Sequence, residues 1–255
     1  MNNKALERWS PLVLLAAIIV VWQLACSWLA VPEFIFPSPL KIAQALAEFT
    51  GPIATAAWQT FWVTMVGFGL SIVVGVLLGL LVGSTRLAHA AMFPLLVAFN
   101  AVPKAAIVPI LVVWFGIGLG PGILTAFLIS FFPITVNMAT GLATLEPELE
   151  DVLRVLGAKR SDVLLKVGLP RSLPYFYASL KVSITLAFVG TVLAEMTAGD
   201  SGIGYLMQSA GSQQRLALAF AGLVVIGAMA MAMYELFSYI EHHTTAWAHR
   251  GSHNE

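Results

Sequence analysis

The chain has 255 residues, of which 59% are hydrophobic and 10% are charged, and its formal net charge is zero. Soluble domains carry about 25% charged residues, so a chain with a mean hydropathy of +0.88 cannot cover its surface with water-facing side chains. The composition predicts one membrane domain, the balanced charge gives no sign of nucleic-acid binding, and the single Cys26 excludes a disulfide framework or a thiolate metal cluster.

Five apolar runs reach the roughly 20 residues that a helix needs to cross a ~30 Å hydrocarbon core. A sixth run is long enough but is interrupted by Pro94, Asn100, Pro103, Lys104 and Pro109. Such breaks are tolerated at membrane depth only where protein or a water-lined cavity satisfies the freed backbone groups. This run is therefore either a pathway wall or a kinked packing helix. We predict an all-α integral membrane protein, a single domain 1–255 with about six spans: 11–31, 57–82, 90–118, 122–142, 175–196 and 216–240.

Two polar segments between these runs have patterns of their own. The first run is longer than the ~7–15-residue core of a signal peptide, so we expect it to stay as an anchor. After it, Leu40, Ala43, Leu46, Ala47 and Phe49 recur at helical spacing and predict a helix on the outer interface. The glycine-rich segment 197–206 predicts an outer loop.

The distribution of Lys and Arg predicts the orientation, because these residues are enriched in cytoplasmic loops. With the N-terminus in the cytosol, two of them lie outside, Lys41 and Arg215. Nine lie in cytoplasmic segments: Lys4, Arg8, Arg86, Arg154, Lys159, Arg160, Lys166, Arg171 and Arg250. We therefore expect both termini in the cytosol.

Much of the charge lies in one cytoplasmic loop, 145–174, which contains "LEDVLRVLGAKRSDVLLKVGLPRSLP". An apolar stripe (Val152, Leu153, Val155 and Leu156) ends at Gly157, a residue type that commonly ends helices in the left-handed conformation. Ser161 or Asp162 is a candidate cap for a second short helix, which we expect Pro170 and Pro174 to end. The pattern predicts a compact pair of helices, either projecting into the cytosol or lying on the lipid headgroups.

The spacing of this loop resembles the EAA loop of binding-protein-dependent ABC transporter permeases: EAA, three residues, G, nine residues, then I-x-LP. Gly157, Leu169 and Pro170 match, Val167 stands for Ile, and Asp151-Val152-Leu153 replaces Glu-Ala-Ala. The segments "VPEFIFPSP", "VPKAAIVPILVVWFGIG", "FFPITVN" and "AEMTAGDSGIGYL" resemble the nitrate/sulfonate/taurine-type branch, over about residues 12–240.

The resemblance implies the type I ABC importer fold and a permease in a bacterial cytoplasmic membrane. It implies a second permease copy, two cytosolic ATPase subunits that hold ATP and Mg²⁺, and a periplasmic or lipid-anchored substrate-binding protein. It implies no cofactor site and no catalytic activity in this chain. Membrane lipid is the remaining expected partner. It implies that the loop couples to the ATPase through Asp151, Arg154, Gly157, Ala158, Lys159, Arg160 and Ser161, followed by the motif residues Leu169 and Pro170.

Four polar residues within the apolar runs are candidates for a translocation pathway: Asn100, Lys104, Asn137 and Glu195. A lysine at the centre of a span costs about 2.5–3.5 kcal/mol on insertion scales, so Lys104 either faces the pathway and attracts an anion or pairs locally to hold the kink. Glu195 is its partner, a gate residue or an interfacial group. Each could equally form an interhelical hydrogen bond.

Two classes of transporter remain open at this point. An ATP-driven importer explains the charged loop, whereas an ion-coupled secondary transporter needs titratable groups in the membrane, for which only Lys104 and Glu195 qualify. The branch resemblance favours a small anion (sulfonate, taurine or nitrate), with pyrimidine- or riboflavin-like compounds and aromatic acids as alternatives.

Overall fold

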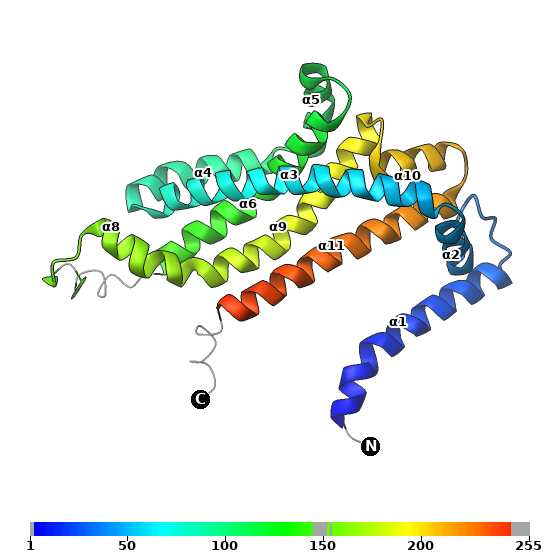
Figure 1. Cartoon of the computed structure of the whole chain (residues 1–255), viewed down its shortest axis with the longest axis horizontal. Coiled ribbons are helices and arrows are strands. Elements are labelled where there is room, and N and C mark those ends of the chain that lie inside the picture. Colours follow the sequence, from blue (N-terminus) through cyan, green and yellow to red (C-terminus); the bar gives the residue numbers. More distant parts are fainter. Residues whose placement is uncertain (1–2, 145–151, 154, 246–255) are drawn as a thin grey trace.

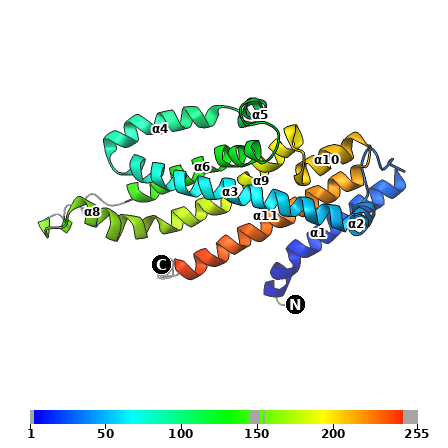
Figure 2. The ribbon, with the colours of Figure 1, turned by 45° about the horizontal axis from the view of Figure 1, so that its top comes forward.

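Four long helices lie side by side in this computed structural model, which describes residues 3–144, 152–153 and 155–245 (Figures 1 and 2). They are α3 (Thr50–Gly83), α6 (Leu119–Ala143), α9 (Leu169–Ala198) and α11 (Leu216–Thr244). Helix α6 packs against both α3 and α9, and α9 packs in turn against α11. Every regular element in the described ranges is a helix, which satisfies the backbone hydrogen bonds within each segment, as hydrocarbon requires.

The N-terminal helix α1 (Asn3–Trp28) diverges from this bundle (Figures 1 and 2). Most of its apolar residues are exposed. It is joined to the bundle near its C-terminal end, where the ring of Trp22 lies 5.2 Å from that of Phe36, and Phe36 lies 5.8 Å from Phe220.

Helix α2 (Pro39–Glu48) forms close to where a helix was predicted, but a different face is buried. Ile42 and Ala45 are buried against the start of α11, while Leu40 is 58% exposed. The predicted helix is thus confirmed, and its apolar residues divide between a face packed on protein and an exposed face. A helix at a membrane interface can turn apolar residues toward lipid as well as toward protein, so spacing alone does not choose the packed face.

The interrupted run folds as three pieces: α4 (Arg86–Ala101), the 3₁₀ helix η1 (Lys104–Ile107) and α5 (Val108–Phe115). Helix α4 and the segment formed by η1 and α5 are bent by 73° relative to each other. Helix α5 rises from the bundle (Figure 1), with Val108 and Leu111 buried. The break has a local cause, because Val102 precedes Pro103 and is extended, with φ −65° and ψ 127°. A residue before proline is sterically pushed out of the α region.

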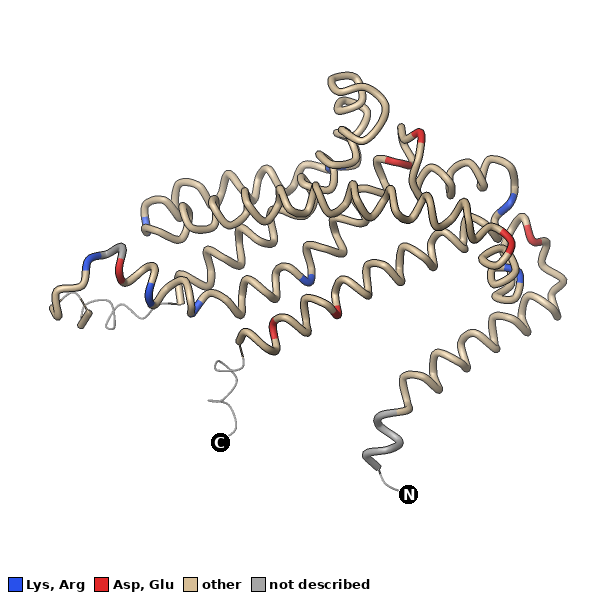
Figure 3. Tube along the Cα trace, in the orientation of Figure 1, with Lys and Arg blue, Asp and Glu red and all other residues tan. Residues whose placement is uncertain are grey.

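Among the described residues, five helices are long and apolar enough to cross a membrane, and the bent pair makes a sixth if it counts as one span. The predicted all-α membrane fold with about six spans is thus confirmed. Charged residues gather toward the ends of the bundle (Figure 3). An exception is the ion pair between Lys181 of α9 and Glu241 of α11, whose charged atoms are 2.6 Å apart. Their side chains are only 19% and 16% exposed. A buried charge requires such a partner.

Small residues let α3 approach α6 closely. Gly67, Ser71, Gly75, Gly79 and Gly83 recur every four residues along α3, and a methyl group added at Gly79 would lie 2.5 Å from Met138 Cβ. Between these glycines the hydroxyls of Ser71 and Ser130 are 2.7 Å apart. Lipid tails are as apolar as leucine side chains, so membrane helices associate through close packing and interhelical hydrogen bonds of this kind.

We expect Gly79→Val to destabilise the bundle by about 1–3 kcal/mol, the usual effect of overpacking a filled site. The measurement is the midpoint of thermal unfolding in detergent. Gly69→Val is the matched control on the same helix, because a Cβ there meets nothing within 4 Å. Equal midpoints for the two variants would contradict this account of the α3–α6 contact.

Candidate functional site

The predicted coupling segment turns at Gly157, and the structure confirms the left-handed conformation there, with φ +90°. The N–H of Ala158 donates to the carbonyl of Leu153 at 3.0 Å. This bond spans five residues and, with the positive φ before it, is the Schellman arrangement that ends a helix. The apolar stripe is thereby separated from the next helix by a tight turn.

That next helix, α8 (Arg160–Val163), begins earlier than predicted. The carbonyl of Lys159 accepts the N–H groups of Asp162 at 2.9 Å and Val163 at 3.1 Å. Neither Ser161 nor Asp162 caps the helix, because both lie within its first turn. Asp162 still favours this helix start, since a carboxylate in the first turn complements the helix dipole. It also pairs with Lys166 at 3.2 Å.

The prolines do not end the second helix, contrary to the prediction. Helix α8 continues through the π-helical turn η2 (Leu164–Gly168) directly into α9. Pro170 and Pro174 both lie inside this continuous stretch, where each removes one backbone N–H donor without ending the helix. The predicted loop and the fifth long helix are therefore one continuous helical segment, and its far end lies beyond the bundle (Figure 1).

This end presents apolar side chains to the outside. Val152, Val155 and Leu156 are 56%, 88% and 78% exposed. We call the residues 152–153 and 155–163 the lever. Of the predicted coupling residues, Gly157 and Lys159 are exposed, Ala158 is partly exposed, Leu169 and Pro170 are half-buried, and Arg160 and Ser161 open α8. Asp151 and Arg154 lie outside the described residues.

The polar residues of the kinked run bond to each other. Lys104 Nζ donates to Asn100 Oδ1 at 2.7 Å and to the Asn100 carbonyl. It thereby satisfies the last turn of α4, a helix end where a cation is favoured. Asn137 likewise bonds within its own helix, donating from Nδ2 to the Pro133 carbonyl at 2.9 Å.

Glu195 has different partners and holds three helices together. Both its carboxylate oxygens accept the Thr60 hydroxyl of α3 at 2.9 Å, and Oε2 accepts the N–H of Gly204 at 2.9 Å. The Thr60 oxygen accepts in turn the N–H of Ile203 at 2.8 Å. Glu195 is only 8% exposed. Lys104 and Glu195 thus have separate partners in this structure.

These bonds organise α10 (Gly202–Ser212), which begins inside the segment 197–206 that we predicted as a loop. Two free N–H groups of the first turn are satisfied by Glu195 and Thr60, from other helices, a cap that no local pattern announces. The glycines leave room for it: a Cβ at Gly202 would meet Glu195 Oε1 at 2.2 Å, and one at Gly204 would meet the Val192 carbonyl at 2.5 Å.

Sequence reasoning missed Thr60 as a partner of Glu195. A weak signal existed, because polar residues four apart occur in both helices, Thr60 and Thr64 in α3 and Thr191 and Glu195 in α9. The second pair also meets, with Thr64 Oγ1 2.9 Å from Thr191 Oγ1. Such a pattern fits a contact between two helices, but it does not say which helices meet.

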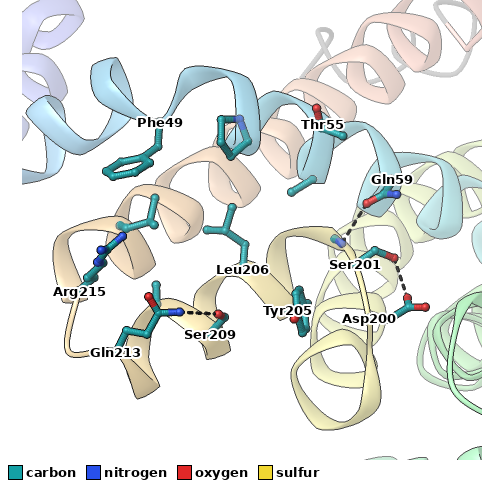
Figure 4. Close-up of a pocket in the computed structure, with 15 residues that line it drawn as sticks. Phe49, Thr55, Gln59, Asp200, Ser201, Tyr205, Leu206, Ser209, Gln213 and Arg215 are labelled. Carbon is teal, nitrogen blue, oxygen red and sulfur yellow. Dashed lines mark hydrogen bonds between the residues drawn. The ribbon is translucent and has the colours of Figure 1, made fainter.

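A polar recess opens beside this network, at the end of the bundle opposite the lever (Figures 1 and 4). Its volume is about 690 Å³. The start of α3, the α9–α10 link, α10 and the start of α11 line it with Gln59, Asp200, Ser201, Tyr205, Ser209, Gln213 and Arg215 among others. Gln59 Oε1 accepts the Gly202 N–H at 3.2 Å. A second, separate cavity of only about 10 Å³ shares Gln59, Asp200 and Ser201 with the recess and is also lined by Glu195.

The family described as "binding-protein-dependent transport system inner membrane component" matches residues 71–243. The chain belongs to this family. It is the permease subunit of an ABC importer, a multi-pass inner membrane protein that is not itself catalytic and that works with ATPase and binding-protein partners.

Relatives that match along nearly the whole chain are named as transport permease proteins. A "probable ABC transporter permease protein" of Haemophilus influenzae is 32% identical over 91% of this chain and 95% of its own length. The formylaminopyrimidine transport permease protein ThiX of Halalkalibacterium halodurans is 26% identical, covering 96% and 98%. The putative aliphatic sulfonates transport permease protein SsuC of Bacillus subtilis is 27% identical, covering 92% and 86%.

The fold is also similar to a solved one. A structure of the MetNI methionine ABC transporter, in an inward-facing conformation, aligns with a TM-score of 0.68 and 19% identity over 77% of this chain and 98% of that chain. This likeness supports the importer permease fold that the loop motif led us to expect.

We expect Glu195→Ala to destabilise the permease by about 1–3 kcal/mol, because the Gly204 N–H loses its buried acceptor. Glu195→Gln keeps one acceptor oxygen and should lose less. Thermal unfolding in detergent measures both. We expect Gly202→Ala to destabilise the permease as much as Glu195→Ala does. Its control is Gly211→Ala in the same helix α10, where nothing lies within 4 Å of a new Cβ. Unchanged stability in Glu195→Ala would refute the capping role.

Proposed function

We propose that this permease moves a small solute inward by alternating access, with the lever seated in a groove of a cytosolic ATPase. The observation that carries the proposal is the exposed apolar surface of the lever, Val152, Val155 and Leu156, on a turn stiffened by the bond between Ala158 and Leu153. Exposed apolar side chains that gather on one surface mark a site of interaction, and a groove of a protein partner would bury them.

The lever is built to transmit force. Helix α8, the π turn and α9 form one continuous segment, so the lever is connected to the span without an intervening loop. Lys159 and Lys166, both exposed near the apolar side chains, suit the role of charges that set orientation and association rate more than affinity. Asp151 and Arg154 belong to the same proposal through the motif.

The wider assembly follows from this role. We propose two ATPase subunits, which bind ATP and Mg²⁺, a second copy of this permease, and a binding protein at the end that holds α10 and the polar recess. We also propose that the lever and both termini face the cytosol, in keeping with the nine Lys and Arg residues expected on that side against two on the other. Family membership favours ATP as the energy source over ion coupling.

We expect Leu156→Asp to abolish uptake while membrane insertion continues, because a charge on a buried interface anchor typically weakens binding by 2 kcal/mol or more, about 30-fold. Gly157→Pro should act similarly, since proline cannot adopt a positive φ. The measurements are co-purification of the ATPase and ATP-dependent uptake in proteoliposomes. Leu156→Met, which stays apolar, is the control and should retain both. Normal co-purification and uptake in Leu156→Asp would defeat the docking proposal.

For the substrate we propose a small anion of the sulfonate, taurine or nitrate class, supported by the branch resemblance and by the sulfonate relative. The formylaminopyrimidine relative and the riboflavin transport permease of Chloroflexus aurantiacus, 30% identical, support heteroaromatic compounds as the second candidate. Lys104 adds little to the anion proposal, because its ammonium group already donates hydrogen bonds to Asn100.

The partner binding protein decides between these classes. A ligand at 100 times its Kd stabilises a protein by about 2.7 kcal/mol, which raises the unfolding temperature of a domain of a few hundred residues by roughly 5–10 °C. We expect alkanesulfonates or taurine to produce that shift in a thermal screen and formylaminopyrimidine and riboflavin to produce none. The reverse pattern would overturn the anion class and leave the importer role intact.

A further inference from the structure

A π-helical turn separates the lever from α9. In this turn, Leu164–Gly168, the N–H of Leu169 donates to the carbonyl of Leu164, five residues back. An α-helix bonds four residues back, so the turn contains one residue more than a regular helix would need. Single π turns of this kind occur frequently at functional sites.

The extra residue lets both sides of the turn pack on the same side. Val163 is 4% exposed, Gly168 is buried, and Ser172 is fully buried. Gly168 and Ser172 are four residues apart, a spacing that places both on nearly the same face of an α-helix. Val163 and Gly168 are five residues apart, which in an α-helix would place them about 140° apart around the axis. A π turn absorbs the additional residue and brings the two buried positions into line.

The α9 side of the turn is closely packed against α6, whereas part of the turn itself is exposed. On the α9 side, a Cβ added at Gly141 of α6 would lie 2.8 Å from Ser172 Cβ, and the Ser172 hydroxyl donates to the Leu169 carbonyl at 2.7 Å. In the turn itself Leu165 is 62% exposed. Pro170 has no N–H, so one backbone bond across the junction is absent in any register. Helices bend at such points.

We propose that Leu164–Gly168 is the joint between lever and span, at which exchange between the π and α registers lets α9 tilt while the lever stays seated on the ATPase. Moving one residue between registers turns the helix by about 100°. The inference rests on the proposed docking of the lever, and it assigns to this turn the angular freedom that a rigid helix lacks.

Deletion of Leu165 tests the joint. Removing this exposed residue leaves Val163 and Gly168 four apart, so a plain α-helix can keep both buried and can keep the lever in its original direction. Asp162 and Lys166 become three apart, which still allows their pairing. We expect the ATPase to co-purify with the deletion variant as with the wild type, and ATP-driven uptake to fall at least tenfold. Leu165→Ala, which keeps the residue count, should transport normally.

Backbone amide hydrogen exchange gives a direct readout on the assembled transporter. In the wild type under ATP turnover, we expect amides 164–169 to exchange at least tenfold faster than those of 180–188 in the packed part of α9. In the deletion variant the two stretches should exchange alike. Should the deletion variant fail to insert, Pro170→Ala, which restores an N–H donor at the junction, should slow exchange at 164–169 and lower uptake severalfold.

The outcomes separate the two proposals. Equal exchange of the two stretches in the wild type overturns the joint, as does near-normal uptake by the deletion variant with the ATPase bound. Either result leaves lever docking intact. Retained ATPase binding in Leu156→Asp instead removes the docking proposal, and the joint with it.

Discussion

In hydrocarbon, every backbone N–H and C=O group must find a partner within the protein, and this constraint accounts for where the permease places its intramembrane polar residues. Each break in a helix exposes such groups, and charged side chains are found at the breaks. Lys104 bonds to the last turn of α4, where the chain kinks at Pro103. Glu195 accepts an N–H from the first turn of α10. In each case the charge has the sign that the helix dipole favours.

This arrangement gives the two ends of the bundle different mechanical characters. At the α10 end, hydrogen bonds of Glu195 and Thr60 tie α3, α9 and α10 into one unit. At the other end, the lever extends past the bundle with its apolar side chains exposed. Helix α9 runs between these two ends of the bundle. The ion pair of Lys181 and Glu241 joins α9 to α11.

Close packing makes such a unit possible without a hydrophobic drive for helix association. The glycines and Ser71 on α3 bring its backbone against α6, and a Cβ at Gly190 would lie 2.9 Å from the α6 backbone at Ala126. Helices in such contact move together or slide as bodies, because a packed interface deforms little. Motion between the ends then concentrates where the packing or the hydrogen-bond ladder is interrupted.

Much of this was predictable from the sequence. The apolar runs, the break at Pro103, the turn at Gly157 and the importer motif are local patterns, because run length, the proline ring and the freedom of glycine act on neighbouring residues. The π turn, the start of α10 and the buried face of α2 were not predictable in this way. The helix start depends on Glu195 and Thr60, which lie seven and 142 residues before Gly202. The buried face of α2 depends on the small residues of α11. Local chemistry therefore determined the long apolar helices, the break at Pro103 and the turn at Gly157. Only the tertiary structure decided which helices meet and which charges satisfy their ends, because those bonds form between residues whose distance along the chain says nothing of their distance in space.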